Sequence, residues 1–133
     1  MLYLDSNVFI YAALNTEDIG DRARALLRRV EQGEEKASSS ALTFDELVWA
    51  VKKYRTLDDA IMAGEAFLNF KGLRLVPVDG GLLVLALGLI RNYELDPRDS
   101  IHAASATLSK AEAIVSTDER FDKVDGLHRK TLS

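Results

Sequence analysis

The segment LYLDSNVFIYAAL, residues 2–14, joins a short β-prone run to a longer apolar run through Asp5 and Ser6. Residues 2–4 are types that favour strands. The apolar residues that follow Asn7 are too continuous for a strand at the surface, and we expect a buried helix there. An aspartate therefore stands where a predicted strand gives way to a predicted helix.

The rest of the chain alternates strand and helix patterns in the same way. We expect one helix that ends near residue 54, further helices over residues 18–32, 57–70, 80–92 and 97–110, and further strands over residues 37–39, 73–78, 113–116 and 130–132. Pro77 makes the 73–78 strand either an edge strand or one that ends at the proline, and we expect it near a sheet edge. Strands that alternate with helices imply right-handed crossovers. The predicted fold class is therefore α/β, a three-layer α/β/α sandwich around a mainly parallel sheet, formed by one domain over residues 1–133.

Residue order also predicts details of the helices. Asp79 is expected to cap the helix that follows it, and Asp96 before Pro97 marks the start of the next one. The spacing of apolar residues between 57 and 70 predicts three that face the core: Ile61, Phe67 and Leu68.

Composition narrows the class of protein. The chain has 133 residues, 47% of them hydrophobic and 29% charged, which suits one globular domain. It has no cysteine, which excludes disulfides, thiolate zinc sites and a cysteine nucleophile. The longest apolar run, residues 82–90, falls well short of the roughly 20 residues that span a bilayer. We therefore expect a cytoplasmic protein with no membrane partner, and its net charge of −4 argues against a uniformly basic surface that coats nucleic acid.

Four acidic residues stand out because of their positions: Asp5, Glu46, Asp99 and Asp118. Three of them lie where a strand-like run ends or a helix begins. A parallel sheet would bring such carboxylates together, because ligands of open α/β sheets lie beyond the carboxyl ends of the strands. Converged carboxylates repel one another unless a cation binds, and Mg²⁺ is usually held by one or two carboxylates with water and phosphate oxygens. The pattern points to phosphodiester chemistry.

Each acid also has a structural alternative. Asp5 is suited to cap the helix after it, and Thr43 with Glu46 has the spacing of a capping box. Asp99 lies in the first turn of a helix, where negative charge is favourable. Asp118 lies in a polar loop, where aspartate is common. The metal hypothesis depends on their joint placement, since capping residues have no reason to gather at one edge of a sheet.

Other polar residues are less informative. His102 is either a general base or a structural residue in an otherwise apolar helix. Neither a P-loop, a dinucleotide fingerprint nor a serine-nucleophile elbow occurs. Two basic clusters either hold phosphates or form solvated helix faces: Arg22, Arg24, Arg28 and Arg29, and Lys52, Lys53 and Arg55.

Three motifs occur in a characteristic order. They are Leu4-Asp5-Ser6-Asn7 after the first strand, Asp99-Ser100-Ile101-His102-Ala103-Ala104 at the start of a helix, and Ser116-Thr117-Asp118 after a short strand. With these motifs, and with Glu46 near the start of the third helix, the chain resembles the PIN-domain family over nearly all its length. Within that family it is similar to the VapC-type toxin ribonucleases of toxin–antitoxin pairs.

The resemblance implies that Asp5, Glu46, Asp99 and Asp118 are the catalytic residues and bind Mg²⁺ or Mn²⁺ in a ribonuclease that cleaves single-stranded or loop RNA. It implies supporting roles for nearby polar residues: Asn7, Ser116, Thr117 and, as an additional acid, Asp122. Asp45 departs from the family pattern by placing a second acid beside Glu46. The helical pattern favours Glu46 as the one that faces the site.

The resemblance also implies partners. A toxin requires an antitoxin, whose tail would cover the acids, and a homodimer is expected, with Trp49 and Tyr54 as either dimer contacts or core residues. Two other functions remain open at this point. One is a non-catalytic interaction module in which the acids are caps. The other is an aspartyl-nucleophile phosphohydrolase, although Asn7 stands where that chemistry requires a second acid.

Overall fold

The computed structural model describes residues 1–132, so the last residue of the predicted domain, Ser133, lies outside the described part. The strands are β1 (Leu2–Leu4), β2 (Ala37–Ser40), β3 (Leu73–Val76), β4 (Ala113–Val115) and β5 (Arg129–Lys130). The helices are α1 (Ser6–Leu14), α2 (Asp18–Glu31), α3 (Ala41–Tyr54), α4 (Leu57–Leu68), α5 (Gly80–Tyr93), α6 (Pro97–Leu108) and the 3₁₀ helix η1 (Glu119–Lys123).

The described strands form one sheet in the order β3-β2-β1-β4-β5, and every pairing between them is parallel. The predicted parallel sheet is confirmed, and β3 is an edge strand, as Pro77 predicts. The last strand begins one residue before the predicted segment and has only two residues. In this order β1 and β4 lie side by side at the centre, although the chain visits β2 and β3 between them.

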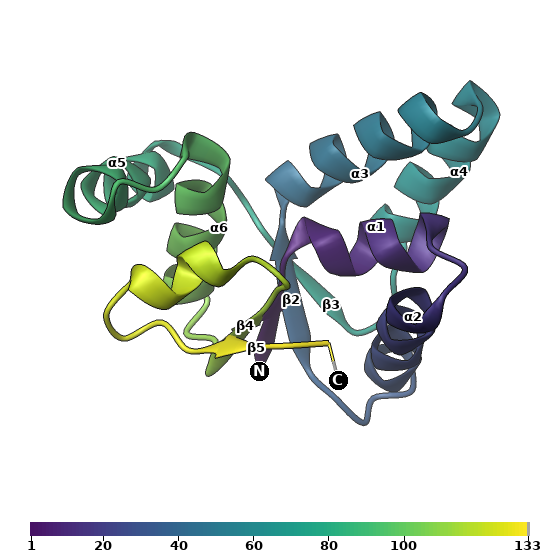
Figure 1. Ribbon diagram of the computed structural model, residues 1–133, viewed down its shortest axis with the longest axis horizontal. Helices are drawn as coiled ribbons and strands as arrows, with labels where there is room; N and C mark the ends of the chain where they lie inside the picture. The colour runs from purple at the N-terminus through teal and green to yellow at the C-terminus, as the bar shows by residue number, and fades with distance from the viewer. Residues whose placement is uncertain (133) are drawn as a thin grey trace.

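Helices cover both faces of the sheet, which confirms the three-layer prediction. Helices α1 to α4 lie on one face, and α5, α6 and η1 lie on the other (Figure 1). The side chains of β1 pack into both helical layers, because successive strand residues point to opposite faces of the sheet. Leu2 and Leu4 pack in the core beneath α1 to α4, whereas Tyr3 packs with residues of α6 and β4.

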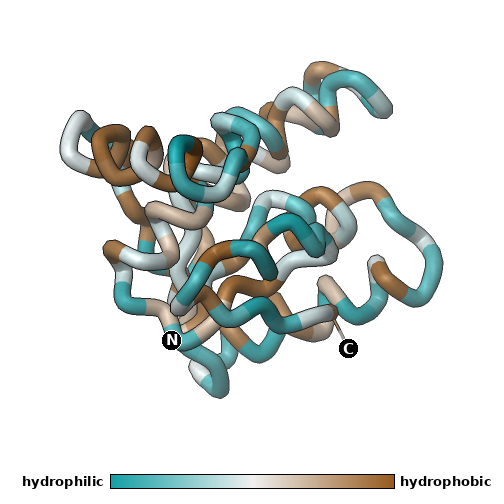
Figure 2. Tube along the Cα trace, turned by 60° about the vertical axis from the view of Figure 1, so that its left-hand side comes forward, coloured by the Kyte–Doolittle hydropathy of each residue, from teal (hydrophilic) through white to brown (hydrophobic). Residues whose placement is uncertain are grey.

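Of the two predicted capping residues on the second face, Asp79 forms its hydrogen bond and Asp96 does not. The Asp79 side chain accepts a hydrogen bond from the Leu82 N–H at 3.0 Å, which confirms the predicted cap of α5. Pro97 begins α6 as expected, but the Asp96 side chain makes no capping bond and pairs with Arg120 instead. Figure 2 shows α5 as a mainly hydrophobic helix. Within residues 1–132, no helix is long and apolar enough to cross a membrane.

The predicted inner face of α4 is partly wrong. Phe67 is buried, but Ile61 and Leu68 are exposed. Gly64 faces α3: a Cβ atom on it would lie 3.1 Å from the Phe44 and Val48 side chains. Close approach of the two helices therefore favours glycine at this contact, which an analysis of hydrophobicity alone overlooks.

The order of the strands creates the crevice in which a site is expected. From β1 the chain crosses to β2 on one side, and from β4 it crosses to β5 on the other. The loops that leave the carboxyl ends of these two neighbours diverge, which opens a gap above the middle of the sheet. Asp5 directly follows β1, and Asp118 closely follows β4.

Candidate active site

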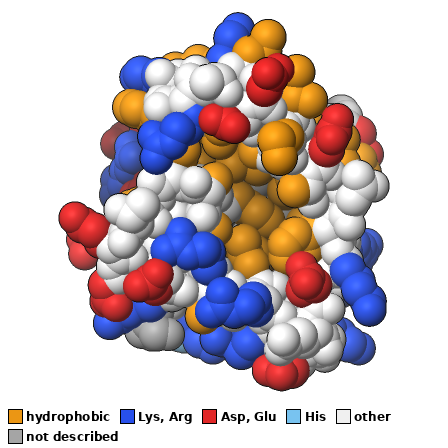
Figure 3. Space-filling model, turned by 90° about the vertical axis from the view of Figure 1, so that its right-hand side faces the viewer, with side chains coloured by type: hydrophobic (Ala, Val, Ile, Leu, Met, Phe, Trp, Pro, Cys, Tyr) orange, Lys and Arg blue, Asp and Glu red, His pale blue; other side chains and the backbone are white. Residues whose placement is uncertain are grey.

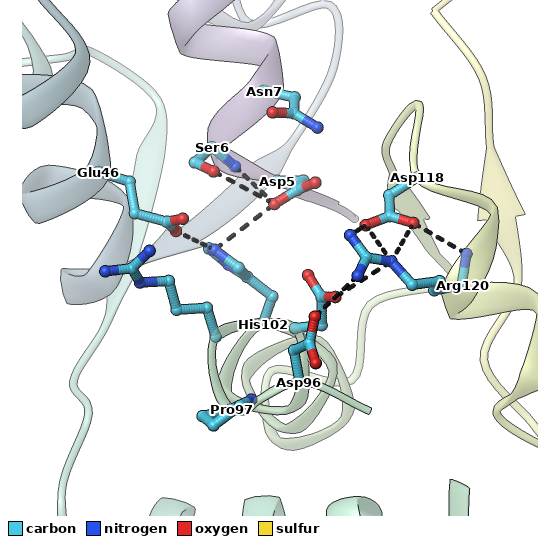
Figure 4. Close-up of a pocket in the computed structure, with 11 residues that line it drawn as sticks. Asp5, Ser6, Asn7, Glu46, Asp96, Pro97, His102, Asp118 and Arg120 are labelled. Atoms are coloured by element: carbon cyan, nitrogen blue, oxygen red, sulfur yellow. Dashed lines mark hydrogen bonds and ion pairs between the residues drawn. The ribbon is translucent and has the colours of Figure 1, made fainter. Parts of the chain in front are cut away.

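One pocket lies at this crevice, with a volume of about 640 Å³. Asp5, Glu46, Asp99 and Asp118 all line it, so the structure brings together the four acids that the sequence separates. They come from the end of β1, the second turn of α3, the first turn of α6 and the loop after β4. Figure 4 labels three of them, Asp5, Glu46 and Asp118. The pocket is also lined by Ser6, Asn7, Asp96, Pro97, Arg98, His102 and Arg120.

Asp5 is fixed at the base of the pocket. Its Oδ1 accepts a hydrogen bond from the Ser6 N–H at 2.8 Å as the N-cap of α1, and its Oδ2 accepts one from the Ser116 hydroxyl at 2.7 Å. The capping alternative is therefore right for Asp5, and the same residue also faces the pocket. Burial raises the pKa of Asp5, while the charge of His102 opposes that rise.

His102 connects the core to the pocket. The imidazole is 1% exposed. Its Nε2 donates to Glu46 Oε1 at 2.5 Å and lies 3.5 Å from Asp5 Oδ1, and its Nδ1 lies 2.8 Å from the Tyr3 hydroxyl. Burial opposes protonation, but the hydrogen bond to Glu46 and the charge of Asp5 outweigh it and raise the pKa of His102. His102 is thus a buried residue that holds a pocket acid.

The capping-box alternative for Glu46 is wrong. Helix α3 begins at Ala41 with Ser40 as N-cap, so Thr43 already lies inside the helix, where it is buried and accepts a hydrogen bond from the Ser39 hydroxyl at 2.8 Å. Glu46 turns towards His102. Its neighbour Asp45 is exposed and does not line the pocket, so the choice between the two adjacent acids falls on Glu46.

Asp99 is the least satisfied of the four acids. It lies in the first turn of α6, and its side chain is 16% exposed. Its Oδ2 is buried and has no hydrogen-bond partner among residues 1–132. Burial and the negative charge of Asp118 raise the pKa of Asp99. A buried carboxylate oxygen without a partner is costly, and a cation would satisfy it.

Asp118 is held by Arg120, two residues later. The carboxylate caps η1 by accepting from the Arg120 N–H at 2.9 Å, and it also accepts from the guanidinium Nε and Nη2, the latter at 2.9 Å. Burial would raise the pKa of Asp118, but these hydrogen bonds hold it below its usual value. The turn role that the sequence suggests for Asp118 is thus right, and it coexists with a place in the pocket.

The pocket has two halves, which Figure 4 displays side by side. We call Asp5, Glu46 and His102 the histidine half. We call the other group the arginine half: Asp96, Asp99, Asp118 and Arg120. In the arginine half, the guanidinium Nη1 donates to Asp96 Oδ2 at 2.8 Å, and its Nε lies 3.6 Å from Asp99 Oδ2.

The predicted supporting residues differ in how they contact the pocket. Ser116 bonds to Asp5 and accepts from the Asp118 N–H at 2.9 Å, so it links the two halves. Asn7 lines the pocket, and its Nδ2 donates to the Thr117 hydroxyl at 3.4 Å. Asp122 does not line the pocket and forms an ion pair with Arg129 at 2.8 Å.

The basic residues of the pocket were not found from the sequence. In the first predicted cluster, Arg22 pairs with Asp18 and Arg24 with Asp21, as expected of a solvated helix face. In the second, Lys53 lies over the Trp49 ring, 4.9 Å from its centroid. The arginines that line the pocket are instead Arg98 and Arg120. The available signal was the Asp-x-Arg spacing at residues 118–120, where a turn returns the arginine to the aspartate.

The donors around the pocket suit a hard divalent cation. The acids offer only carboxylate oxygens, which Mg²⁺ and Mn²⁺ prefer. The buried Oδ2 of Asp99, which accepts no hydrogen bond within residues 1–132, points to the same kind of ion. Within residues 1–132, no group of three or more acidic or histidine side chains is arranged to hold a metal ion. Glu46 is turned to His102 and Asp118 to Arg120, which leaves Asp5 and Asp99 as the acids that would hold an ion directly.

Comparison with known proteins agrees with this geometry. The model of the PIN domain family matches residues 2–127. The VapBC2 complex of Rickettsia felis, bound to a promoter DNA fragment, has a chain that is 18% identical with a TM-score of 0.76, and 98% of each chain is covered. VapC20 of Mycobacterium tuberculosis, described as a toxin that cleaves the sarcin–ricin loop, is 14% identical with a TM-score of 0.73, over 90% of this chain and 91% of that one.

FitAcB of Neisseria gonorrhoeae is 21% identical with a TM-score of 0.74, over 99% of this chain and 98% of that one. At these identities the likeness extends to the fold alone. No curated protein sequence matches the chain.

Proposed function

Because the chain belongs to the PIN-domain family, we propose that it is a metal-dependent endoribonuclease, formed by one domain over residues 1–133, that acts in the cytoplasm as the toxin of a toxin–antitoxin pair. One observation carries the proposal: Asp5, Glu46, Asp99 and Asp118 come from four parts of the chain and line a single pocket. Similar folds in VapBC and FitAcB proteins, and in a toxin described as cleaving the sarcin–ricin loop, add support.

In this proposal Asp5 and Asp99 hold Mg²⁺ or Mn²⁺ directly, and Glu46 and Asp118 assist through water. A bound ion would lower the pKa of an attacking water and offset the charge of the RNA phosphate. Asp5 suits a ligand role because hydrogen bonds fix both its oxygens, which reduces the entropy lost on binding. Ser116 orients that carboxylate. Arg98 at the pocket rim is available to attract the phosphate backbone.

The test is cleavage of a loop-containing RNA by the purified protein with Mn²⁺ or Mg²⁺. Asp5→Asn and Asp99→Asn should each lower the cleavage rate by at least about a hundredfold, in line with the loss of one electrostatic group from an active site. Asp45→Asn is the matched control, since Asp45 adjoins Glu46 outside the pocket, and it should keep the parental rate. EDTA should stop cleavage, and excess Mn²⁺ should restore it.

Parental cleavage by the Asp5→Asn protein would contradict the assignment. A non-catalytic interaction module would show neither cleavage nor stabilisation by Mn²⁺, so a thermal unfolding series with added Mn²⁺ distinguishes the two functions.

An apolar groove on the α1 to α4 side supports the antitoxin part of the proposal. Its volume is about 190 Å³. Figure 3 shows this face as a hollow filled by hydrophobic side chains, with Lys and Arg side chains along one margin. An amphipathic helix of an antitoxin is the expected occupant, because such helices lay an apolar face into a hydrophobic groove. The lining residues are Phe9, Ala12, Ala13, Leu27, Leu47, Ala63, Ala66, Phe67 and Phe70.

Other exposed apolar side chains support the homodimer. Trp49 and Tyr54 are 61% and 60% exposed, so the core alternative for them is wrong. On the opposite layer, Leu83, Val84 and Leu87 are exposed on α5. Large exposed apolar residues that gather on one element are typical of a contact with another protein.

Two charge substitutions separate the proposed contacts. Ala66→Glu, at an exposed position in the groove, should prevent co-purification with the co-expressed antitoxin and leave the dimer intact. Val84→Glu on α5 should weaken the dimer, seen by light scattering, and leave antitoxin binding intact. An antitoxin complex that survives Ala66→Glu would remove the groove from the proposal, and a dimer that survives Val84→Glu would remove α5.

A further inference from the structure

Arg120 occupies a position that a metal ion would otherwise compete for. Both oxygens of Asp118 accept from its guanidinium, Oδ1 from Nε at 3.1 Å and Oδ2 from Nη2 at 2.9 Å. The same guanidinium reaches Asp96 and approaches Asp99. One cation therefore contacts all three aspartates of the arginine half.

These contacts leave Asp118 little capacity for another partner. A carboxylate has about four lone-pair sites for hydrogen bonds. Asp118 directs Oδ1 to the Arg120 N–H and Nε, and Oδ2 to Nε and Nη2. A divalent ion that bound Asp118 directly would have to displace the guanidinium.

The histidine half differs because it contains no permanent cation. Asp5 and Glu46 face His102, whose charge depends on its protonation. Across the pocket, Asp99 Oδ2 lies 3.6 Å from Arg120 Nε but accepts no hydrogen bond within residues 1–132, so an ion that binds this oxygen displaces no hydrogen bond. The space between Asp5 and Asp99 is thus the place where a first ion meets the least opposition.

We propose that Arg120 acts as the resident second cation of the pocket, so that the protein binds one divalent ion tightly, at Asp5 and Asp99, and a second only weakly. The inference rests on the proposed metal-dependent function and answers how many ions that function uses. Its physical reason is that a second divalent ion at Asp118 would have to break the hydrogen bonds from Arg120 to both carboxylate oxygens. That ion would also be repelled by a guanidinium that remains charged at every working pH.

The test is a Mn²⁺ titration followed by electron paramagnetic resonance of the free ion, with calorimetry on the same samples. The parental protein should bind one Mn²⁺ per chain, with a second at least about thirtyfold weaker. Arg120→Gln should raise the affinity for the second Mn²⁺ by at least about tenfold. Arg120→Lys, which keeps the charge, should stay close to the parental count.

Arg98→Gln is the matched control. It removes the same charge from the same pocket, but Arg98 forms no ion pair in the described residues 1–132. It should change the affinity of either ion by less than about threefold. Folding of Arg120→Gln is checked by thermal unfolding, and the parental ion count tests the inference even where that variant fails to fold.

Several outcomes would overturn the inference alone. They are two ions of similar affinity on the parental protein, unchanged binding by Arg120→Gln, and equal effects of Arg98→Gln and Arg120→Gln. The absence of Mn²⁺ binding by every variant would overturn the proposed metal-dependent function together with it.

Discussion

The histidine half of the pocket contains two carboxylates and the arginine half three, and the two halves neutralise this charge by different means. In the histidine half, Asp5 and Glu46 face a buried imidazole that is anchored by Tyr3. In the arginine half, Asp96, Asp99 and Asp118 face a guanidinium that is half exposed and reaches in from a loop. One half is built into the core, and the other is assembled at the surface.

This difference in burial indicates which half contributes more to the stability of the folded protein. A buried charged group whose partner is removed remains uncompensated, whereas exposed ion pairs contribute little because water replaces them. We therefore expect the histidine half to contribute more to the free energy of unfolding. The arginine half should determine how the pocket responds to added cations.

The largest expected difference lies in catalysis. Asp5→Asn should reduce RNA cleavage by at least about a hundredfold. Asp118→Asn should reduce it only about tenfold, because Asp118 is hydrogen-bonded to Arg120 and would contact the metal only through water. Single-turnover cleavage rates at saturating Mn²⁺ measure both. Asp122→Asn, in an acid paired with Arg129 outside the pocket, is the control and should have no effect. Equal losses for Asp5→Asn and Asp118→Asn would mean that the halves are catalytically equivalent.

Substitutions in the two halves should also differ in their effect on the free energy of unfolding. His102→Ala should lower the free energy of unfolding by about 3 kcal/mol, because it leaves Glu46 and the buried Tyr3 hydroxyl without their partner. Arg120→Gln should leave urea denaturation nearly unchanged. His102→Gln, whose amide is able to donate to Glu46, should recover part of the loss. A destabilisation by Arg120→Gln as large as that of His102→Ala would refute the distinction.

A smaller effect concerns pH. The folded pKa of His102 is raised, so its contribution is complete below the unfolded value and is lost as pH rises through the folded pKa. The raised pKa values of Asp5 and Asp99 have the same sign, because charging these acids costs more in the folded state. The metal-free protein should therefore be more stable at pH 5.5 than at pH 8.

Urea denaturation in EDTA at these two pH values measures the difference. Saturating Mn²⁺ should reduce it, since the ion compensates the carboxylates at high pH. Greater stability at pH 8 without metal would contradict the expected sign.

The smallest expected effect is a gain in the stability of the metal-free protein. Asp99→Asn removes a partly buried charge whose Oδ2 has no hydrogen-bond partner within residues 1–132, and it should stabilise the metal-free protein by about 0.5 kcal/mol after allowance for solvent screening. Asp96→Asn, in an exposed neighbour, is the control and should be neutral. A loss of stability in Asp99→Asn would show that the ion pair of Asp99 with Arg120, 3.6 Å away, outweighs the cost of burying the carboxylate.

Local sequence predicted the order of strands and helices and the edge position of β3, because β propensity, helical spacing and Pro77 act over a few residues. It failed where two helices meet. Ile61 and Leu68 were expected in the core, yet the contact of α4 with α3 runs through Gly64 and its neighbours, since the distance between the helices, not hydrophobicity, decides which side chains fit.

The sequence by itself determined which acids could meet, since the predicted parallel sheet sends Asp5 and Asp118 to the same edge. The tertiary structure decided how each one is held. Glu46 abandons the predicted capping box for His102, and Asp118 keeps its turn but closes on Arg120. Glu46 and His102 lie 56 residues apart, so only the fold brings them together. Arg120 lies two residues from Asp118, but its reach to Asp96 and Asp99 depends on where the fold places α6 beside this turn.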